Sequence, residues 1–408
     1  MEKREYIFPA GFLWGAATSA HQVEGGNIND WSEWEKTNSA RLAKEATLRQ
    51  AQGINPWPDF ILKKYPNPLQ EENYISGIAC DHYNRFREDF DIAKSLGHNA
   101  HRFSIEWSRV EPAEGRFDEA AIEHYRQVIL ALTAQRVEPF VTLWHWTLPL
   151  WVRDIGGWEN KKTIEYFTRY VGKIVETLGN KVKFWVILNE PNVYTGNGYF
   201  KGIWPPGRHS LIKYLLANHH LSQAHVATYK IIKEKNPVAQ IGVAHNMVCF
   251  NKFFAGIKRY IYNFLFLNSI KRYQDFVGIN YYISDKNTRE RTDMNWPVDA
   301  EGFYSVLKDV GRYQKPIYVL ENGLADVRDE KRAKFIKDHL FFVRKAIQEG
   351  IDVRGYFYWS LLDNFEWSDG FWPRFGLVEI DYKTLERKIR PSAWEYAKIC
   401  RTNKIESF

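Results

Sequence analysis

Short apolar runs alternate with longer amphipathic segments along most of the chain. The short runs are rich in β-branched and aromatic residues, as buried strands are, whereas the longer segments carry apolar residues at helical spacing. Strands are expected at 12–18, 99–107, 137–144, 183–188, 240–244, 276–282, 316–320 and 353–360. Helices are expected at 82–96, 119–134, 161–178, 211–236 and 325–349. This alternation predicts a parallel sheet, and about eight strands are enough to close a barrel.

An open, doubly wound sheet is the alternative for the same pattern. It would normally carry a glycine-rich phosphate turn, and the glycine-containing stretch 196–202 lacks the G-x-G-x-x-G spacing. The 408 residues contain no linker-like run, and barrels with inserted loops reach this length. We therefore expect an α/β fold, a single (β/α)8 TIM barrel over 1–408 with elaborated βα loops. The stretch 27–78 is expected to be a long loop over one mouth, with a helical piece near 40–50.

Two of the expected strands end beside a glutamate. The fourth strand is followed by Glu190 and the seventh by Glu321, where Asn322-Gly323 predicts a turn. A carboxylate at the end of an apolar strand costs free energy unless it is paired, and for one such residue a salt bridge or helix cap would be reason enough. Two in matching positions suggest a pair across a shared cavity. Glycoside hydrolysis needs a nucleophile and a proton donor about 5 to 5.5 Å apart when configuration is retained.

Polar and aromatic residues stand at other strand ends as well, on the face where barrels carry their chemistry. The set comprises Gln22, Arg102, His145, Trp146, Asn189, Glu190, Asn280, Tyr281, Tyr282, Glu321 and Trp359. With these residues, and with motifs running from 12–18 to 374–378, the chain resembles glycoside hydrolase family 1. That family comprises retaining β-glycosidases, including β-glucosidases and β-galactosidases.

The resemblance implies a role for each site residue. Glu190 in Asn-Glu-Pro matches the acid/base, Glu321 in Glu-Asn-Gly matches the nucleophile, and Asn189 matches the residue that bonds the sugar 2-OH. Arg102 and Tyr282 are expected to keep the nucleophile ionised. Substrate contacts are expected from Gln22, His145, Trp146, Asn280, Trp296, Trp359, Glu366, Trp367 and Phe375. Taken singly, the polar side chains of this set also fit structural roles, and the rings at 296 and 375 also fit core packing.

The chain departs from the family pattern at two positions. Ile187 and Leu320 stand where relatives usually carry Thr, and we expect each to place an aliphatic group beneath a catalytic carboxylate and so to alter rate or pH optimum. The chain is also short between 246 and 275, with about 28 residues, which predicts a more open cleft on that side.

The implied function is hydrolysis of terminal β-D-glucosyl units, and also β-D-galactosyl or β-D-fucosyl units, through a covalent glycosyl-enzyme. A 6-phospho-β-glycosidase is one alternative, but a carboxylate at Glu366 would repel phosphate. A plant-type thioglucosidase would carry Gln in place of Glu190. A catalytically impaired, glycan-binding barrel is the alternative from another class, and loss of either glutamate would be its signature. The loops at 27–78 and 195–210, which would set aglycone preference, show no readable pattern.

Composition narrows the partners further. The net charge of +7 arises from 56 basic and 49 acidic residues of interspersed sign, so no nucleic-acid partner is expected. Aromatic residues make up 16% of the chain and suit stacking on sugars. The histidines at 98 and 101 and at 219, 220 and 225 lack clustered Cys or carboxylate residues, so neither a metal nor a cofactor is expected.

The sequence also predicts the cellular compartment of the protein. Three cysteines at wide spacing are typical of small core residues in a reducing compartment. No apolar run approaches the roughly 18 residues that a membrane span needs, and no signal core follows the N-terminus. We therefore expect a cytoplasmic protein without a membrane partner; the pattern leaves the oligomeric state open.

Overall fold

Eight parallel strands close a barrel in chain order in the computed structural model, which describes residues 5–251 and 255–406. The strands are β2 (Leu13–Ala17), β3 (Ala100–Ser104), β4 (Glu138–Trp144), β5 (Phe184–Asn189), β6 (Gln240–Cys249), β7 (Val277–Ser284), β8 (Ile317–Asn322) and β9 (Val353–Trp359). Strand β2 closes the ring by pairing with β3 through Gly15 and Ala100 and with β9 through Gly15 and Phe357. The predicted (β/α)8 barrel is confirmed, and all eight expected strands are present.

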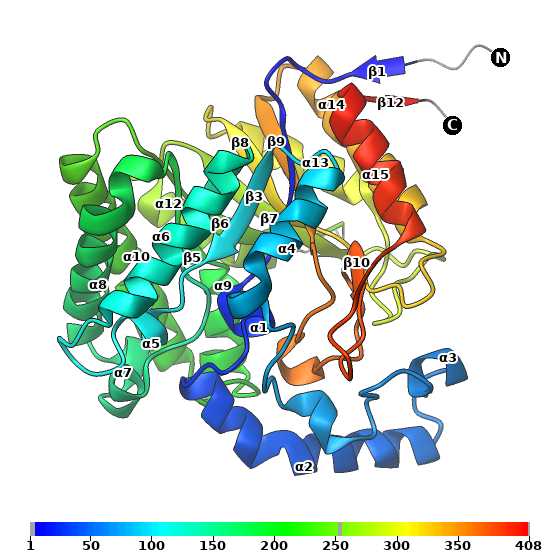
Figure 1. Cartoon of the computed structure of the whole chain (residues 1–408), viewed down its shortest axis with the longest axis horizontal. Coiled ribbons are helices and arrows are strands. Elements are labelled where there is room, and N and C mark those ends of the chain that lie inside the picture. The colour runs from blue at the N-terminus through cyan, green and yellow to red at the C-terminus, as the bar shows by residue number, and fades with distance from the viewer. Residues whose placement is uncertain (1–4, 252–254, 407–408) are drawn as a thin grey trace.

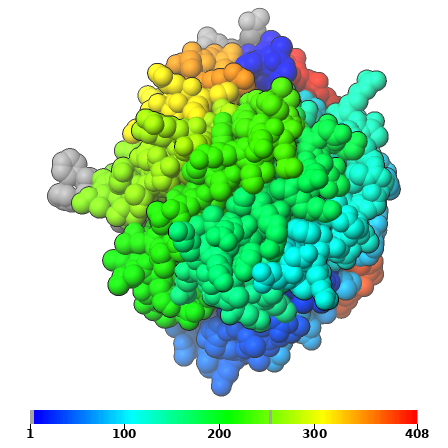
Figure 2. Space-filling model, turned by 90° about the vertical axis from the view of Figure 1, so that its left-hand side faces the viewer, coloured from blue at the N-terminus to red at the C-terminus, as the bar shows by residue number. Residues whose placement is uncertain are grey.

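Helices cover the outside of the barrel. The longer ones are α4 (His82–Ser95), α6 (Glu119–Ala134), α8 (Lys162–Leu178), α10 (Leu211–Lys235), α13 (Ala300–Gly311), α14 (Arg332–Gln348) and α15 (Pro391–Thr402). Helices α6, α8 and α10 lie along one flank (Figure 1), and the same cyan-to-green chain hides the strands from that side (Figure 2). Helix α8 shows why these segments fold here, because Phe167, Val171, Ile174 and Leu178 are buried at helical spacing.

Helix α14 begins later than the sequence predicts. The helix expected from 325 starts at Arg332, because Asp326 holds the preceding loop. Its Oδ2 accepts hydrogen bonds from the backbone N–H groups of Lys331, at 2.8 Å, and of Arg332, at 3.0 Å. A carboxylate that accepts these bonds satisfies the free N–H groups at the start of the helix and fixes where it begins.

The stretch expected to be a loop at 27–78 is largely helical. Helix α2 (Asp30–Ala51) has 22 residues, and α3 (Asp59–Leu62) and the 3-10 turn η1 (Glu71–Tyr74) follow it. Asn29 and Ser32 form a reciprocal capping box at its start. Helix α2 lies across one end of the molecule, away from the paired strands β1 (Glu5–Ile7) and β12 (Lys404–Glu406) (Figure 1). The helical piece expected near 40–50 lies within α2. The rest of the long-loop prediction was wrong because polar residues interrupt the apolar face of this helix.

The interior of the barrel is closed by stacked aromatic rings. The rings of Phe140 and Phe184 stack with their centroids 4.1 Å apart, and Phe276, Tyr318 and Phe357 pack in the same cluster. The barrel is therefore a packed core and not a channel, which leaves the carboxyl ends of the strands as the open face.

The strand β8 does not turn where Asn322-Gly323 predicted a turn. It continues through Asn322, and the backbone of Gly323 then lies against β9. A Cβ at Gly323 would stand 1.9 Å from the carbonyl oxygen of Trp359. Glycine is required here by close approach of two backbones and not by turn geometry.

Short elements lie in the connections that follow the strands. They are α1 (Ala20–Val23), α5 (Trp107–Val110), α7 (Leu150–Asp154), α9 (Pro191–Thr195), α12 (Leu265–Ile270), and the hairpin of β10 (Val378–Ile380) and β11 (Arg387–Ile389). Cys80, Cys249 and Cys400 are buried and unpaired. Within residues 5–251 and 255–406, the helices are too short or too polar to cross a membrane.

Candidate active site

The two glutamates predicted as a pair lie at the open face of the barrel. Glu190 directly follows β5, and Glu321 is the second-last residue of β8. Each of these residues is only 4% exposed. Asn280 of β7 donates a hydrogen bond from Nδ2 to Glu190 Oε1 at 2.8 Å, and its amide also acts on the pKa of Glu321. The two carboxyl groups therefore lie close enough to interact and share one amide partner.

Glu321 has the partners of an ionised carboxylate. Nη1 of Arg102 lies 2.5 Å from Oε1, and the Tyr282 hydroxyl donates to Oε2 at 2.7 Å. Arg102 is itself held by Thr142 Oγ1 at 2.9 Å and by Asn189 Oδ1 at 2.7 Å. Burial raises the pKa of Glu321, while Arg102 and Tyr282 oppose that rise by stabilising its charge.

Glu190 has the partners of a proton donor. Burial raises its pKa to about 8, and the charge of Glu321 adds to this effect, while the amides of Asn280 and Asn246 act against it. Because Arg102 bonds Glu321 and not Glu190, a proton shared by the pair belongs on Glu190. The backbone of Glu190 has a φ of 41°, and Pro191 then begins α9 at the first helical position.

Asn189 connects the cation to a neutral histidine. Its Oδ1 accepts from Arg102, and its Nδ2 donates to His145 Nε2 at 3.0 Å. Burial, together with the charge of Arg102, holds the pKa of His145 well below its usual value, so the ring is neutral and Nε2 can accept. Trp146, which was predicted to bind substrate, donates its indole N–H to the backbone oxygen of Asn189 at 3.0 Å. Its polar atom is thus bound within the protein.

The loops after β2 and β9 contribute Gln22, Glu366 and Trp367 to the site. Nε2 of Gln22 donates to the backbone oxygen of Phe365 at 2.8 Å and lies 3.4 Å from Glu366 Oε2. Burial raises the pKa of Glu366 well above its usual value, and Asp369, Glu321 and Glu190 add to the rise. The ring of Trp367 stacks on His145 at 5.8 Å.

Three aromatic rings cluster beside Glu321. The ring of Trp296 lies 6.0 Å from that of Tyr282, and the ring of Phe375 lies 6.3 Å from it. Trp359, at the end of the neighbouring strand β9, packs in the same cluster and stacks with His145 at 6.2 Å. Tyr281, the neighbour of Tyr282, points away, because its hydroxyl donates to the backbone oxygen of Asp299. These contacts bring the predicted residues together at the open face of the barrel, with Tyr281 directed away from them.

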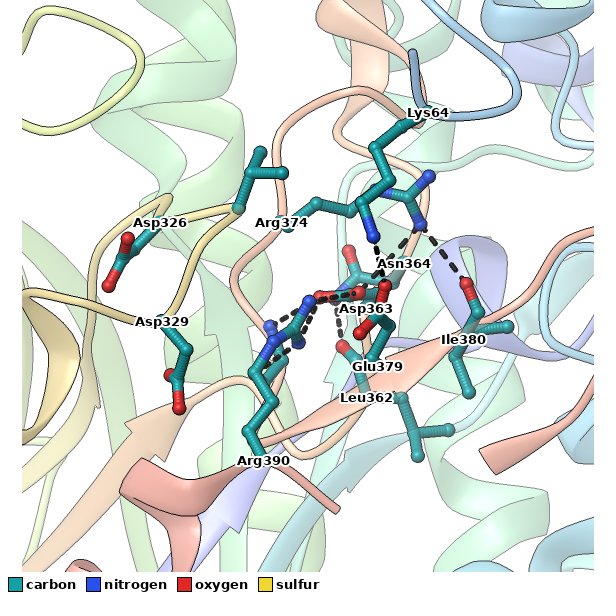
Figure 3. Close-up of polar contacts among 12 residues, drawn as sticks. Lys64, Asp326, Asp329, Leu362, Asp363, Asn364, Arg374, Glu379, Ile380 and Arg390 are labelled. Atoms are coloured by element: carbon teal, nitrogen blue, oxygen red, sulfur yellow. Dashed lines mark hydrogen bonds and ion pairs between the residues drawn. The ribbon is translucent and has the colours of Figure 1, made fainter. Parts of the chain in front are cut away.

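Buried ion pairs hold Asp363, which lies in the same loop as Glu366 (Figure 3). Arg390 donates to both carboxylate oxygens of Asp363, each at 2.9 Å, and Arg374 lies 3.7 Å from Asp363. Although burial acts to raise the pKa of Asp363, Arg390 and Arg374 hold it below its usual value. The sequence analysis did not predict these ion pairs, because nothing in the local pattern around 363, 374 and 390 indicates that these side chains pair.

Irregular strand pairing redirects the site residues toward one another. The register shifts between Val186 and Asn189 where β5 pairs with β6, between Ile279 and Asn280 where β7 pairs with β8, and between Val319 and Asn322 where β8 pairs with β9. Such shifts break the strict alternation of side chains and redirect them. They fall at the site on each of these strands.

Ile187 does not lie beneath a carboxylate as predicted. Phe184 and Val186 pack inside the barrel, whereas Trp185 and Ile187 belong to the cluster between the strands and the helices. The expectation failed because alternation places 187 on the outer side of β5.

Leu320 does face the barrel interior. It packs in the inner cluster, and its Cδ1 lies 2.3 Å from where a Cβ at Gly278 would stand. The glycine of β7 therefore leaves the space that the leucine of β8 fills.

Asn246 is a site residue that the sequence analysis missed. Its Nδ2 donates to Glu190 Oε1 at 3.0 Å. The expected strand ended at 244, but β6 continues to Cys249 and brings Asn246 to the open face. Continued alternation beyond 244 was the available signal.

The closed (β/α)8 barrel with two buried, unequally paired glutamates defines a glycoside hydrolase. The family model described as "Glycosyl hydrolase family 1" matches residues 4–253 and 279–405, and the chain belongs to that family. "Beta-glucosidase A" of Thermotoga maritima is 33% identical, over 98% of this chain and 99% of its own length. The structure of the "beta-glycosidase from Pyrococcus horikoshii" superposes with a TM-score of 0.86 at 35% identity, covering 99% of this chain and 97% of that one. The Thermotoga maritima β-glucosidase in complex with deoxynojirimycin superposes with a TM-score of 0.83 at 30% identity, covering 98% and 99%.

Proposed function

We propose that the chain is a retaining exo-β-glycosidase that removes terminal β-D-glucosyl units, and also β-D-galactosyl or β-D-fucosyl units. The observation that carries this proposal is the unequal pairing of the two glutamates. Glu321 has a cation and a hydroxyl donor on its oxygens, whereas the donors to Glu190 among the described residues are the amides of Asn246 and Asn280. The relatives named as β-glucosidases support the choice of sugar.

The first chemical step forms a glycosyl-enzyme. A carboxylate oxygen of Glu321 attacks the anomeric carbon, the bond to the glycosidic oxygen breaks, and Glu190 gives its proton to the departing oxygen. Asn189 is placed between Arg102 and His145, and its amide would bond the sugar 2-OH as positive charge develops at the anomeric carbon.

The second step reverses these roles. Once Glu321 is an ester its charge is gone, and the contribution of that charge to the raised pKa of Glu190 disappears. Glu190 is then a carboxylate that removes a proton from water, and the water oxygen attacks the anomeric carbon and displaces Glu321. The product keeps the β configuration because two inversions have occurred.

An unphosphorylated sugar is favoured over a sugar 6-phosphate. Glu366 interacts with Glu190, Glu321 and Asp369, so acidic groups whose pKa values are raised are already concentrated at this site. A phosphate would add further negative charge, and Arg102 is already bonded to Glu321, Thr142 and Asn189.

Azide rescue tests the proposal. Glu321→Ala and Glu190→Ala should both lose most activity on nitrophenyl β-glucoside, about a thousandfold or more for the nucleophile. Azide should restore Glu321→Ala with an α-glycosyl azide and Glu190→Ala with a β-glycosyl azide. Full activity in both variants, or β product from Glu321→Ala, would refute the assignment. Sugar preference is measured with the unmodified enzyme on the nitrophenyl derivatives of β-galactoside, β-fucoside and 6-phospho-β-glucoside.

A further inference from the structure

The connection between β6 and β7 approaches the acid/base glutamate without a role in the mechanism above. It contains α11 (Gly256–Arg259), the five-residue π-helix η5 (Tyr260–Phe264) and α12. Residues 254–278 fall between the two ranges that the family model matches. The likeness to the family therefore does not account for the contacts made here.

Side chains fasten this connection to the end of β6. Asn263 accepts from the backbone N–H of Val248 at 3.1 Å and donates to its backbone oxygen at 2.8 Å. The backbone oxygen of Tyr262 lies 3.2 Å from both Asn192 Nδ2 and His245 Nε2. Tyr262 is thus fixed beside α9, the helix that Glu190 precedes.

The hydroxyl of Tyr262 determines which way the Asn246 amide faces. It donates to Asn246 Oδ1 at 3.1 Å, and Asn246 Nδ2 donates to Glu190 Oε1 at 3.0 Å. While the hydroxyl donates its proton to the amide oxygen, the NH2 end faces the carboxyl group; a flipped amide would leave that hydroxyl proton without this acceptor. With the amide turned around, an oxygen would face Glu190 instead and would disfavour the carboxylate.

The two amides distinguish the oxygens of Glu190. Oε1 accepts from both Asn246 and Asn280, and an oxygen that accepts two N–H groups is a poor place for a proton. In the part of the chain that the structure describes, no hydrogen bond is made to Oε2. The acidic proton therefore belongs on Oε2, the oxygen left to meet the glycosidic oxygen.

We propose that Tyr262 is a positioning residue that acts through Asn246 to keep the acidic proton of Glu190 on Oε2. This inference rests on the proposed role of Glu190 as acid/base. Without the hydroxyl, the Asn246 amide can take either orientation, and the proton can then occupy either oxygen. Proton donation to the leaving group weakens as a result, while attack by Glu321 is unaffected.

Leaving groups of different basicity provide the test. A 2,4-dinitrophenyl group departs without a proton, whereas a phenyl group needs one. Tyr262→Phe should lower kcat/KM for phenyl β-glucoside about fivefold, the factor that one side-chain hydrogen bond is worth. It should leave 2,4-dinitrophenyl β-glucoside nearly unchanged, and that substrate also shows that the variant is folded. Tyr260→Phe is the matched control, because Tyr260 is in the same π-helix but 50% exposed.

A double-mutant cycle tests the route through Asn246. Asn246→Ala should show the same selective loss, and Tyr262→Phe should then add little to it. Equal losses on both substrates, an equal effect of Tyr260→Phe, or additive losses in the double variant would overturn the proposal.

The Glu190→Ala variant distinguishes failure of this inference from failure of the proposed acid/base role on which it rests. If Glu190 is the acid, Glu190→Ala loses far more activity on the phenyl than on the dinitrophenyl substrate. If Glu190→Ala loses more activity on the phenyl substrate but Tyr262→Phe affects both substrates equally, the positioning role of Tyr262 alone is rejected. A non-selective Glu190→Ala would reject the proposed mechanism itself.

Discussion

Removing the Tyr282 hydroxyl should move the acid limb of the pH profile upward. This hydroxyl donates to Glu321 Oε2 at 2.7 Å in a buried site. A hydrogen bond to a charged group contributes about 1.5 to 3 kcal/mol, which corresponds to about one to two pKa units. The bond favours the ionised form, so Tyr282→Phe raises the pKa of Glu321. The nucleophile is then protonated at a higher pH, and activity is lost earlier on acidification.

The assay is kcat/KM for 2,4-dinitrophenyl β-glucoside from about pH 4 to 9, because this substrate does not need the acid. We expect the acid limb to rise by about one unit or more and the plateau to fall. Tyr281→Phe is the control, since its hydroxyl donates to the backbone oxygen of Asp299 and should leave the limb in place. A folded Tyr282→Phe enzyme with an unmoved acid limb would refute this account of how Glu321 stays ionised.

Three further changes test the scaffold. Asp363→Asn should cost about 3 to 5 kcal/mol in unfolding free energy, measured in denaturant, because Arg390 would be left buried without its charge partner. In the parent enzyme, the lowered pKa of Asp363 predicts that this stabilisation holds above about pH 4 and is lost as pH falls through the folded-state pKa; Asp363→Asn should flatten that acid dependence. Gly323→Ala should cut kcat/KM more than about tenfold, since its Cβ must displace the Trp359 carbonyl; normal activity would contradict the close approach. Leu320→Thr should destabilise the barrel by about 2 kcal/mol by removing buried methyl groups and adding a hydroxyl, and an unchanged melting temperature would contradict that packing.

The barrel could be predicted because its strands are buried on both faces. Such strands are continuous apolar runs, and the helices between them have a clear apolar stripe, as in α8. Helix α2 has no such stripe, because its buried face includes Glu35 and Ser39 beside Trp31 and Ala43. The helical spacing of apolar residues alone therefore could not predict helix α2. Its capping box at Asn29 and Ser32 lacked the acidic or amide residue at N3 that makes the usual pattern recognisable.

The site residues at strand ends could be predicted as a set, but not the contacts that determine their chemistry. Glu190 and Glu321 are equivalent by position, and both have raised pKa values through burial. The difference between them comes from Arg102 and Tyr282, which reach one carboxyl group from β3 and β7. Partners brought together by barrel closure have no local sequence signal.

The register shifts explain why reasoning from strict alternation failed near the chemistry. In a regular strand, Leu320 and Glu321 would point to opposite faces, and one of them would be lost to the helix layer. The shift between Val319 and Asn322 lets Leu320 fill the barrel while Glu321 still reaches Arg102. The shift on β5 does the same for Val186 and Asn189. The barrel thus keeps a closed core directly below the site, because regular pairing is interrupted where Asn189 and Glu321 turn inward.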